Sequence, residues 1–494
     1  MLTLTILIPL AAALALALLP RLPEATLRQL ATVLAAVPLV LLAVVWLRFD
    51  TSAGAPAFQA VEEIAWMPSL GVAWRLGVDG ISLAIAGMSA LLFVAAIAWP
   101  VATRGKPHAY YAWCLFLQSV SLGVFLALDL LVFYVFFDLS LVGMYFLISR
   151  WGHGDARAAA LKFFLYTLIG SLAILLAIIA LALAVEPTSF DMRVLIERQP
   201  LAGTQLRAGL VLLGFVFGFA VKTPLFPFHT WLPPAHVDAP APASAILAGV
   251  LLKMGVYGLF RMPLSMMRGT FARYALALGV LALVSILWGA LVALAQNNLK
   301  RRIAYTSVNH MGYAVLGVAA AGAGGSEAAR RLALVGSVTE LIAHGLITGA
   351  LFLIAGAFWR RTETYELGAY GGLAQRAPRL MVLMTLAAFA SLGLPALAGF
   401  VAEFQIFAGT FAVAPWLAAA ALLGIVITAA LFLQMIQQLF FGELPAARAD
   451  FTDLDRVEFT VLLVLLLMVV IVGIYPSWLL RMIASAASVF ARAI

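Results

Sequence analysis

Five ionisable side chains fall inside long apolar segments of this sequence: Asp138, Lys222, Lys253, Glu340 and Glu403. A charge at the middle of a bilayer costs at least about 2.5–3.5 kcal/mol, so each of these residues requires an explanation. One interpretation is that they form static ion pairs between helices, but apolar packing joins helices without the cost of desolvating charges. The other is a relay in which neighbouring acids and bases load and pass protons. We favour the relay.

Four histidines accompany these charges: His229, His236, His310 and His344. Near pH 7 an imidazole can both donate and accept a proton, which suits transfer through water. Each histidine taken alone is better explained as a hydrogen-bonded polar residue at a helix interface. Their spacing matches no zinc or haem pattern, so we assign no metal.

Glu340 and His344 are four residues apart on one predicted helix, so their side chains share a face and can touch. An ionised carboxylate in that position would stabilise a charged imidazole. Two roles are therefore open for Glu340: it could join the relay, or it could tune His344 beside a path that works without it.

The elements that hold these residues must be membrane helices. The chain has 494 residues, of which 65% are hydrophobic and 11% charged, and its mean hydropathy is +1.08. Soluble proteins are about half apolar and a quarter charged, and a single aqueous core stops growing beyond about 250–300 residues. This composition excludes a soluble enzyme, a nucleic-acid-binding protein and a secreted disulfide scaffold. The net charge of +8 is explained by Lys and Arg in loops near anionic lipid headgroups.

A helix needs about 20 apolar residues to cross a membrane, and about 14 segments meet this measure. They are 2–19, 28–47, 80–99, 110–127, 129–149, 160–184, 208–230, 240–262, 273–295, 302–321, 332–357, 378–411, 415–441 and 457–480. Alternating strand patterns are absent, so the sequence predicts an all-α, polytopic membrane protein with a single domain, 1–494. Cys114 is the only cysteine, which leaves no disulfide within the chain and no thiolate set for an iron–sulfur cluster.

The seventh and twelfth predicted spans are interrupted by proline. Pro224 follows Lys222 closely, and Pro395 precedes Glu403 in the other span. Proline removes a backbone donor and clashes with the preceding turn, so both helices should open near mid-membrane. Interrupted helices in corresponding positions indicate two inverted five-helix repeats, 110–262 with helices 4–8 and 273–441 with helices 9–13. Two ordinary proline kinks are the alternative, and the ionisable group at each break favours the repeats.

The loops suggest an orientation. Loops that follow odd-numbered spans carry a modest excess of Lys and Arg. Because positively charged loops tend to stay in the cytoplasm, we expect both termini on the periplasmic side.

Six stretches of the sequence are typical of one family. They are LGVDGISL at 76–83, FAVKTP at 219–224, PFHTWLP at 227–233, AHVDAP at 235–240, LAGVLLKMG at 247–255 and IAYTSVNHMG at 303–312. Through them the chain resembles the antiporter-like M subunits of proton-pumping NADH:quinone oxidoreductase, respiratory complex I. The resemblance extends over nearly the whole chain.

The resemblance implies roles for four residues. In this family an acid on helix five pairs with the lysine of broken helix seven, a lysine on helix eight continues the path, and an ionisable group on helix twelve is the outlet. These roles fall on Asp138, Lys222, Lys253 and Glu403, and glutamate at the last position is typical of the M type. The sequence departs from the family at Asp138, where glutamate is usual, at Gly143, where proline is usual, and at Glu340, where the residue is usually uncharged. Because the family's path runs without an acid at the last position, the resemblance implies that Glu340 tunes His344 and is not an obligatory carrier.

The resemblance also implies partners. It predicts a bacterial inner membrane, L-type and N-type antiporter-like neighbours, surrounding lipids and no nucleic acid. No cofactor is expected in this chain, because NADH, flavin, iron–sulfur clusters and quinone belong to partner subunits. One alternative is a D-type subunit of a multi-subunit cation/proton antiporter, and another is a scaffold without a proton path.

Overall fold

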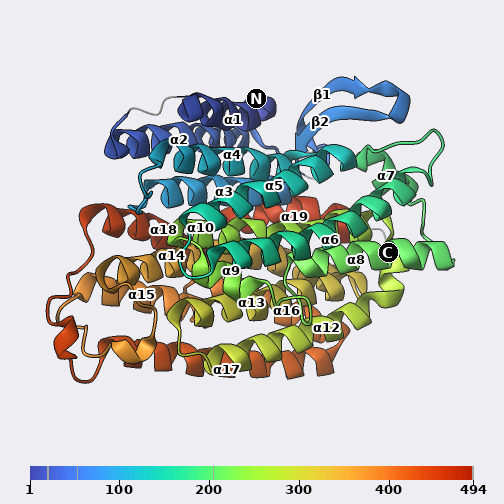
Figure 1. Cartoon of the computed structure of the whole chain (residues 1–494). Coiled ribbons are helices and arrows are strands. Elements are labelled where there is room, and N and C mark those ends of the chain that lie inside the picture. The colour runs from blue at the N-terminus through green and yellow to red at the C-terminus, as the bar shows by residue number, and fades with distance from the viewer. Residues whose placement is uncertain (19–21, 53, 204, 492–494) are drawn as a thin grey trace.

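The structure is a bundle of long helices with one small β-hairpin at its edge (Figure 1). It is a computed structural model that describes residues 1–18, 22–52, 54–203 and 205–491. The long helices and strands are α1 (Leu2–Leu18), α2 (Glu24–Arg48), β1 (Gln59–Met67), β2 (Val72–Val78), α3 (Gly80–Ala98), α4 (Pro107–Leu126), α5 (Leu130–Trp151), α6 (Ala156–Ala182), α8 (Leu206–Lys222), α12 (Arg268–Leu294), α13 (Leu299–Gly322), α14 (Glu327–Thr362), α15 (Pro378–Ser391), α16 (Ala398–Val413), α17 (Pro415–Phe440), α18 (Arg456–Ile474) and α19 (Ser477–Ala491). The short helices are α7 (Met192–Arg198), α9 (Leu232–Asp238), α10 (Ala241–Ile246) and α11 (Lys253–Leu259).

Helices form in every predicted span, so the all-α, polytopic fold is confirmed. Ten of the described helical segments are long and apolar enough to cross a membrane, and α1, α15 and α16 are shorter apolar helices. Position 19, the expected end of the first span, lies outside the described residues, as do positions 20, 21, 53, 204 and 492–494 of the predicted domain. The last span ends earlier than expected, at Ile474 rather than at 480, and α19 follows as a separate helix.

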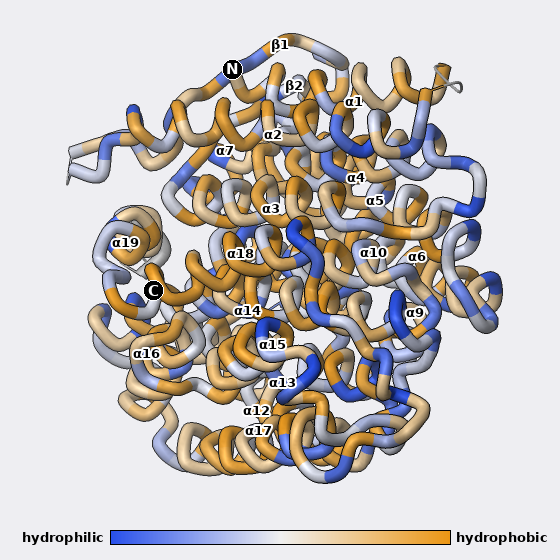
Figure 2. The backbone as a smooth tube through the Cα atoms, turned by 90° about the vertical axis from the view of Figure 1, so that its left-hand side faces the viewer, coloured by the Kyte–Doolittle hydropathy of each residue, from blue (hydrophilic) through white to orange (hydrophobic). Residues whose placement is uncertain are grey.

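The helices divide into an outer layer and a buried centre. The outer helices α6 and α17 expose leucine side chains such as Leu176 and Leu423, whereas α14 is buried along its membrane-spanning window. Figure 2 looks towards one end of the bundle, where hydrophilic segments gather in the loops while the helical coils are mostly hydrophobic. Apolar side chains outside and polar groups inside are what a lipid environment requires.

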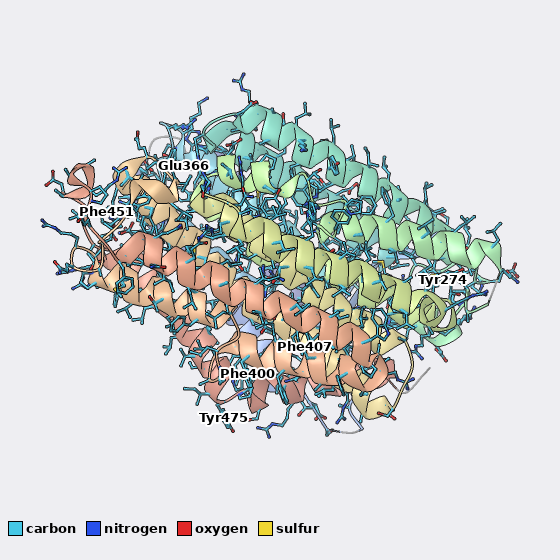
Figure 3. The ribbon with its side chains drawn as sticks, turned by 90° about the horizontal axis from the view of Figure 1, so that it is seen from below. Tyr274, Glu366, Phe400, Phe407, Phe451 and Tyr475 are labelled. Carbon is cyan, nitrogen blue, oxygen red and sulfur yellow. The ribbon has the colours of Figure 1, made fainter. Side chains whose placement is uncertain are left out.

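Helix α14 is the central element of the bundle. It packs against α13 and α16, against α10, and against α3, α18 and α19. The N-terminal helices lie on one side of it and α12 and α17 on the other (Figure 1). Tyr274, near the start of α12, and Glu366, just after α14, lie at opposite ends of the bundle (Figure 3), which defines the direction in which the helices would cross a membrane.

Both interrupted spans open where the prolines predict. Helix α8 ends at Lys222 and the chain continues through turns to α9. Helix α15 ends at Ser391, and α16 begins at Ala398. A third irregular span was not predicted: α10 and α11 are joined by a π-helical turn at Leu247–Leu251, and another follows at Phe260–Leu264. Such π-helical turns are frequent at functional sites, and the first of them directly precedes the Leu252–Lys253 step.

The β-hairpin is the element that the sequence analysis missed, since strand patterns were judged absent. Strand β2 carries Arg75, whose Nη1 lies 2.9 Å from Asp129 Oδ2. Asp129 also accepts hydrogen bonds from the backbone nitrogens of Leu131 and Val132 and so caps the start of α5. The hairpin is therefore tied to the helix that carries Asp138.

Candidate functional site

Lys253 and His344 are in direct contact at the centre of the bundle. Lys253 Nζ lies 2.5 Å from His344 Nδ1 and donates to the carbonyl oxygen of Ala248 at 2.6 Å. Both side chains are buried. The first residue of α11 is thereby joined to the middle of α14. Because an ammonium group has donors only, His344 Nδ1 is the acceptor whenever Lys253 is charged.

His310 of α13 connects three further groups. Its Nδ1 lies 3.1 Å from Glu340 Oε1 and 3.8 Å from Glu403 Oε1, and its Nε2 lies 3.0 Å from Ser391 Oγ. Ser391 is the last residue before the break of the twelfth span, and Glu403 is on the half-helix that follows it. Two carboxylates thus face one imidazole. Because two buried negative charges repel each other, this arrangement favours a proton shared among the three groups.

The sequence analysis expected Glu340 to contact His344, and this expectation is wrong. Glu340 bonds to His310 on the neighbouring helix, and His344 bonds to Lys253. The two histidine rings complete the connection, with centroids 5.4 Å apart. Helical spacing identifies residues that share a face, but partners on adjacent helices then compete for the same side chains.

The break in the twelfth span gives Glu403 its place. Gly393 has a φ of +76°, which L side chains rarely adopt. A Cβ atom at this position would collide with Glu403 Oε2. Glycine therefore serves two purposes here: it allows the turn between the half-helices, and it leaves room for the carboxylate.

Lys222 and Asp138 approach each other without forming an ion pair among the described residues. Lys222 Nζ donates to Ser140 Oγ at 3.3 Å and lies 4.8 Å from the centre of the Phe137 ring. The carboxylate of Asp138 is close enough to act electrostatically on Lys222. Its Oδ1 is buried and has no hydrogen-bond partner within the described part of the chain. The two groups are thus near each other in an open arrangement.

His236 is a further buried histidine that lies near Lys253. Its ring stacks on Phe352 with centroids 4.4 Å apart, and both Lys253 and Lys300 act electrostatically on it. His229 lies further out, where its Nε2 accepts a hydrogen bond from Trp288 Nε1 at 3.3 Å. Neither ring nitrogen of His236 has a hydrogen-bond partner within the described part of the chain. The hydrogen bonds and ring contact described above therefore connect His310 and His344, while His236 and His229 lie outside that group.

Lys300 is a buried charge that the sequence analysis set aside with the loops. Its Nζ donates to the carbonyl oxygens of His236 at 2.9 Å and Ala239 at 2.5 Å. Lys300 is the second residue of α13 and is followed by Arg301 and Arg302. Because three consecutive basic residues are typical of a loop, the sequence placed Lys300 outside the membrane. The position of Lys300 just before the predicted span 302–321 is the sequence feature that could have identified it.

A second missed pair is Arg261 with Asp79. Arg261 Nη1 lies 2.7 Å from Asp79 Oδ2, and both side chains are buried. Asp79 also caps α3 through the backbone nitrogens of Ile81 and Ser82. The pair joins α3 to the π-helical turn after α11, so we assign it to holding that span in place.

Taken together, the structure brings Lys253, His344, His310, Glu340 and Glu403 into one buried cluster, which we call the central relay. Two of its pairs, Lys253 with His344 and His310 with Glu340, are hydrogen-bonded. The two histidine rings are 5.4 Å apart, and Glu403 lies 3.8 Å from His310 Nδ1. All five groups can gain or lose a proton, so the central relay has the chemistry needed to pass protons across the middle of the bundle.

Comparisons with known proteins concern the family and the fold. A family model described as NADH:quinone oxidoreductase/Mrp antiporter, transmembrane, matches residues 127–428. A protein named NAD(P)H-quinone oxidoreductase chain 4 from Thermosynechococcus vestitus is 39% identical over 491 residues, covering 96% of this chain and 89% of the relative. A Picosynechococcus protein of the same name is also 39% identical, over 493 residues, with the same coverage.

Solved structures show the same fold. A chain of respiratory complex I from Thermus thermophilus with bound NADH has a TM-score of 0.89 and 33% identity, covering 100% of this chain and 99% of that one. A chain of the Mrp complex from a Dietzia species has a TM-score of 0.86 at 21% identity, covering 99% and 97%, and at that identity the likeness concerns the fold.

Proposed function

Because the chain belongs to the NADH:quinone oxidoreductase/Mrp antiporter transmembrane family, we propose that it is a proton-translocating membrane subunit of an NADH:quinone oxidoreductase, of the M type. The observation that carries the proposal is the central relay, in which Lys253 contacts His344 and His310 contacts both Glu340 and Glu403. The 39% identity with proteins named chain 4 of NAD(P)H-quinone oxidoreductase supports the assignment.

In the proposed path, protons enter from the side of Lys222 and Lys253 and leave at Glu403. A proton on Lys253 passes to His344 through their contact. Transfer from His344 to His310 needs a bridging water or the rotation of a ring, because the ring centroids are 5.4 Å apart. From His310 the proton reaches Glu403 at the break of the twelfth span.

Asp138 and Lys222 form the switch of this path. The open arrangement seen here leaves Lys222 bonded to Ser140. Closing the pair would hold the proton on Lys222, and opening it would release the proton towards Lys253. His229, His236 and Lys300 contribute to the access route, since Lys300 is buried beside His236, where its Nζ donates to the backbone carbonyl oxygen of that residue.

The remaining parts of the proposal follow from the family resemblance. The two inverted repeats are 110–262 and 273–441, and the whole chain forms a single membrane domain. Redox chemistry with NADH, flavin, iron–sulfur clusters and quinone takes place in partner subunits, so this chain holds no cofactor. Its neighbours are L-type and N-type subunits and lipids in a bacterial inner membrane, with both termini on the periplasmic side.

The test is NADH-driven proton uptake into vesicles that contain the purified complex. Lys253→Met should abolish most of the uptake while the complex still assembles. Lys162→Met is the matched control, because Lys162 is an exposed lysine on α6. Normal uptake by the Lys253→Met variant would refute the path.

A second candidate is a subunit of a cation/proton antiporter, favoured by the fold shared with the Mrp complex. The same vesicles distinguish the two functions. Proton movement that requires a sodium gradient but no NADH would establish the antiporter function and reject the first candidate.

A further inference from the structure

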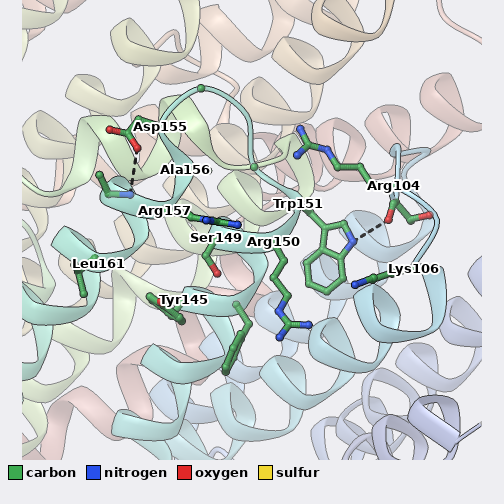
Figure 4. Close-up of a pocket in the computed structure, with 15 residues that line it drawn as sticks. Arg104, Lys106, Tyr145, Ser149, Arg150, Trp151, Asp155, Ala156, Arg157 and Leu161 are labelled. Atoms are coloured by element: carbon green, nitrogen blue, oxygen red, sulfur yellow. Dashed lines mark hydrogen bonds between the residues drawn. The ribbon is translucent and has the colours of Figure 1, made fainter.

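A large basic cavity lies apart from the central relay, at the end of the bundle where α5 passes into α6. Its volume is about 940 Å³, and it is lined by the loop 103–106, the last turns of α5 and the first turns of α6 (Figure 4). This volume is at the upper end of the range for ligand-binding pockets, about 300–1,000 Å³. The proton path described above uses none of the residues that line it.

The cavity carries an excess of positive charge. Four cations line it: Arg104, Lys106, Arg150 and Arg157. Within the described part of the chain, none of these four side chains forms an ion pair or donates a side-chain hydrogen bond. Arg150 instead lies over the Phe146 ring, with 5.4 Å between its Cζ and the ring centroid.

The one acid in the cavity does not neutralise these cations. Asp155 accepts a hydrogen bond from the backbone nitrogen of Ala158 at 3.4 Å and so caps α6 (Figure 4). Four like charges that line one cavity repel each other, and a bound anion relieves the repulsion. Arginine suits a phosphate group in particular, because its planar fork can donate two parallel hydrogen bonds.

The lower wall of the cavity is apolar and opens onto the outer face of α6. Tyr145, Phe146 and Leu161 line it. From Leu161 the outer face of α6 continues as a row of exposed apolar side chains along the membrane direction: Leu161, Leu165, Ile169, Leu172, Leu176 and Leu183. A free phosphate ion makes no favourable contact with these apolar side chains, whereas acyl chains would lie along them.

We propose that this cavity binds the phosphate headgroup of an anionic phospholipid, with its acyl chains along α6. Trp151 closes the headgroup end, where its Nε1 donates to the carbonyl oxygen of Thr103 at 3.0 Å (Figure 4). Tryptophan and arginine at one level are typical of the boundary between headgroups and acyl chains. The inference does not depend on proton translocation.

The experiment measures binding of short-chain phosphatidylglycerol to the delipidated complex by native mass spectrometry. The test variant is Arg104→Gln with Arg150→Gln, and the matched control is Arg301→Gln with Arg376→Gln, two exposed arginines outside the cavity. Loss of two headgroup contacts should weaken binding about 30-fold in the test variant and leave it unchanged in the control. Phosphatidylcholine should bind at least about tenfold more weakly than phosphatidylglycerol, because its headgroup carries no net charge.

Three results would overturn the proposal. Equal binding of phosphatidylglycerol to the wild type and the test variant would show that the cavity is not the site. Displacement of the lipid by millimolar inorganic phosphate, with the same sensitivity to the substitutions, would assign the cavity to free phosphate. Cross-linking of Arg104→Cys to a neighbouring subunit in the intact complex would show that protein fills it.

Melting curves of the lipid-free complexes guard against a folding artefact. The test variant should unfold at the same temperature as the wild type, since both arginines are exposed. The additional variant Arg150→Lys retains the charge and should bind phosphatidylglycerol within about threefold of the wild type. If Arg150→Lys binds as weakly as the test variant, charge is not what holds the ligand and the proposal fails.

Discussion

Lys253 on α11 and His344 on α14 share a hydrogen bond of 2.5 Å, although they are 91 residues apart in the sequence. When Lys253 is charged, the proton of the imidazole must be on Nε2, because Nδ1 then accepts. That Nε2 atom is buried and has no partner among the described residues. The lysine therefore orients His344 with a free donor position on the other side of the ring.

The first prediction concerns the release of a proton by Lys253. Lys253→Arg should lower NADH-driven proton uptake at least about tenfold, because a guanidinium keeps its proton at physiological pH and cannot pass it on. Proton uptake into vesicles measures the effect, with Lys162→Arg as the control. An active Lys253→Arg variant would mean that a fixed charge is sufficient at this position.

The second prediction concerns the switch. Asp138→Asn should abolish most proton uptake, whereas Asp138→Glu should preserve it because the longer side chain reaches Lys222 more easily. Ser140→Ala removes the group to which Lys222 is bonded in the open arrangement and should impair uptake less than Asp138→Asn does. Normal uptake by Asp138→Asn would make the carboxylate a structural residue.

The third prediction separates the two carboxylates that face His310. Glu403→Gln should abolish most proton uptake, because Glu403 is the outlet of the proposed path. Glu340→Gln should leave uptake largely intact and change its dependence on pH between pH 6 and 9, with His310 rather than His344 as the group affected. Loss of uptake at every pH in Glu340→Gln would make Glu340 an obligatory carrier.

The fourth prediction uses the glycine at the break. Gly393→Ala should destabilise the protein by about 1–3 kcal/mol, since a side chain would be forced into a backbone conformation with φ of +76°. It should also impair proton uptake by displacing Glu403. Gly368→Ala is the control, because no atom lies within 4 Å of a Cβ added there. Equal melting temperatures and uptake in the two variants would contradict the role of Gly393.

The fifth prediction is a pH effect on stability in the loop between α5 and α6. Burial, together with the charges of Lys300 and Arg104, lowers the pKa of His153 from 6.5 to about 3. The unfolded chain binds this proton more readily than the folded one, so stability is constant above pH 6.5 and falls as the pH decreases from there towards 3.

His153→Gln tests this effect. The variant should lose the ring stacking on Trp359, which has a centroid distance of 4.1 Å, and melt at a lower temperature at pH 7. Between pH 7 and pH 5 its melting temperature should fall less than that of the wild type. Parallel curves for the two proteins would show that His153 does not titrate in this range.

The positions of the helices could be predicted from the sequence because lipid imposes a simple rule on composition and length. The two breaks were predictable for a similar reason, since Pro224 and Pro395 act locally on their own helices. The β-hairpin was not predictable. Its strands pair with irregularities between Gln59 and Glu62 and between Ala65 and Met67, and these irregularities disrupt the alternation that identifies a strand.

The partners within the central relay were also beyond the sequence. The spacing of Glu340 and His344 predicts a contact within one helix, but Lys253 and His310 approach α14 from other helices and form the shorter contacts. The π-helical turn before Lys253 adds an offset that helical periodicity does not reveal. Depth in the membrane was thus predictable from local sequence, whereas partner choice depends on how the helices pack.

Helix α14 has 36 residues, which corresponds to a rod of about 54 Å. The hydrocarbon core of a bilayer is only about 30 Å thick, and about 40–45 Å including the headgroups. Both ends of the rod therefore stand in water on opposite sides of the membrane, and Glu340 lies about 20 Å from its beginning. A helix with its two ends in opposite aqueous phases holds Glu340 and His344 at a fixed depth in the membrane. Protons must therefore pass these residues by exchange of hydrogen-bond partners, because the residues themselves cannot move across the membrane with a bound proton.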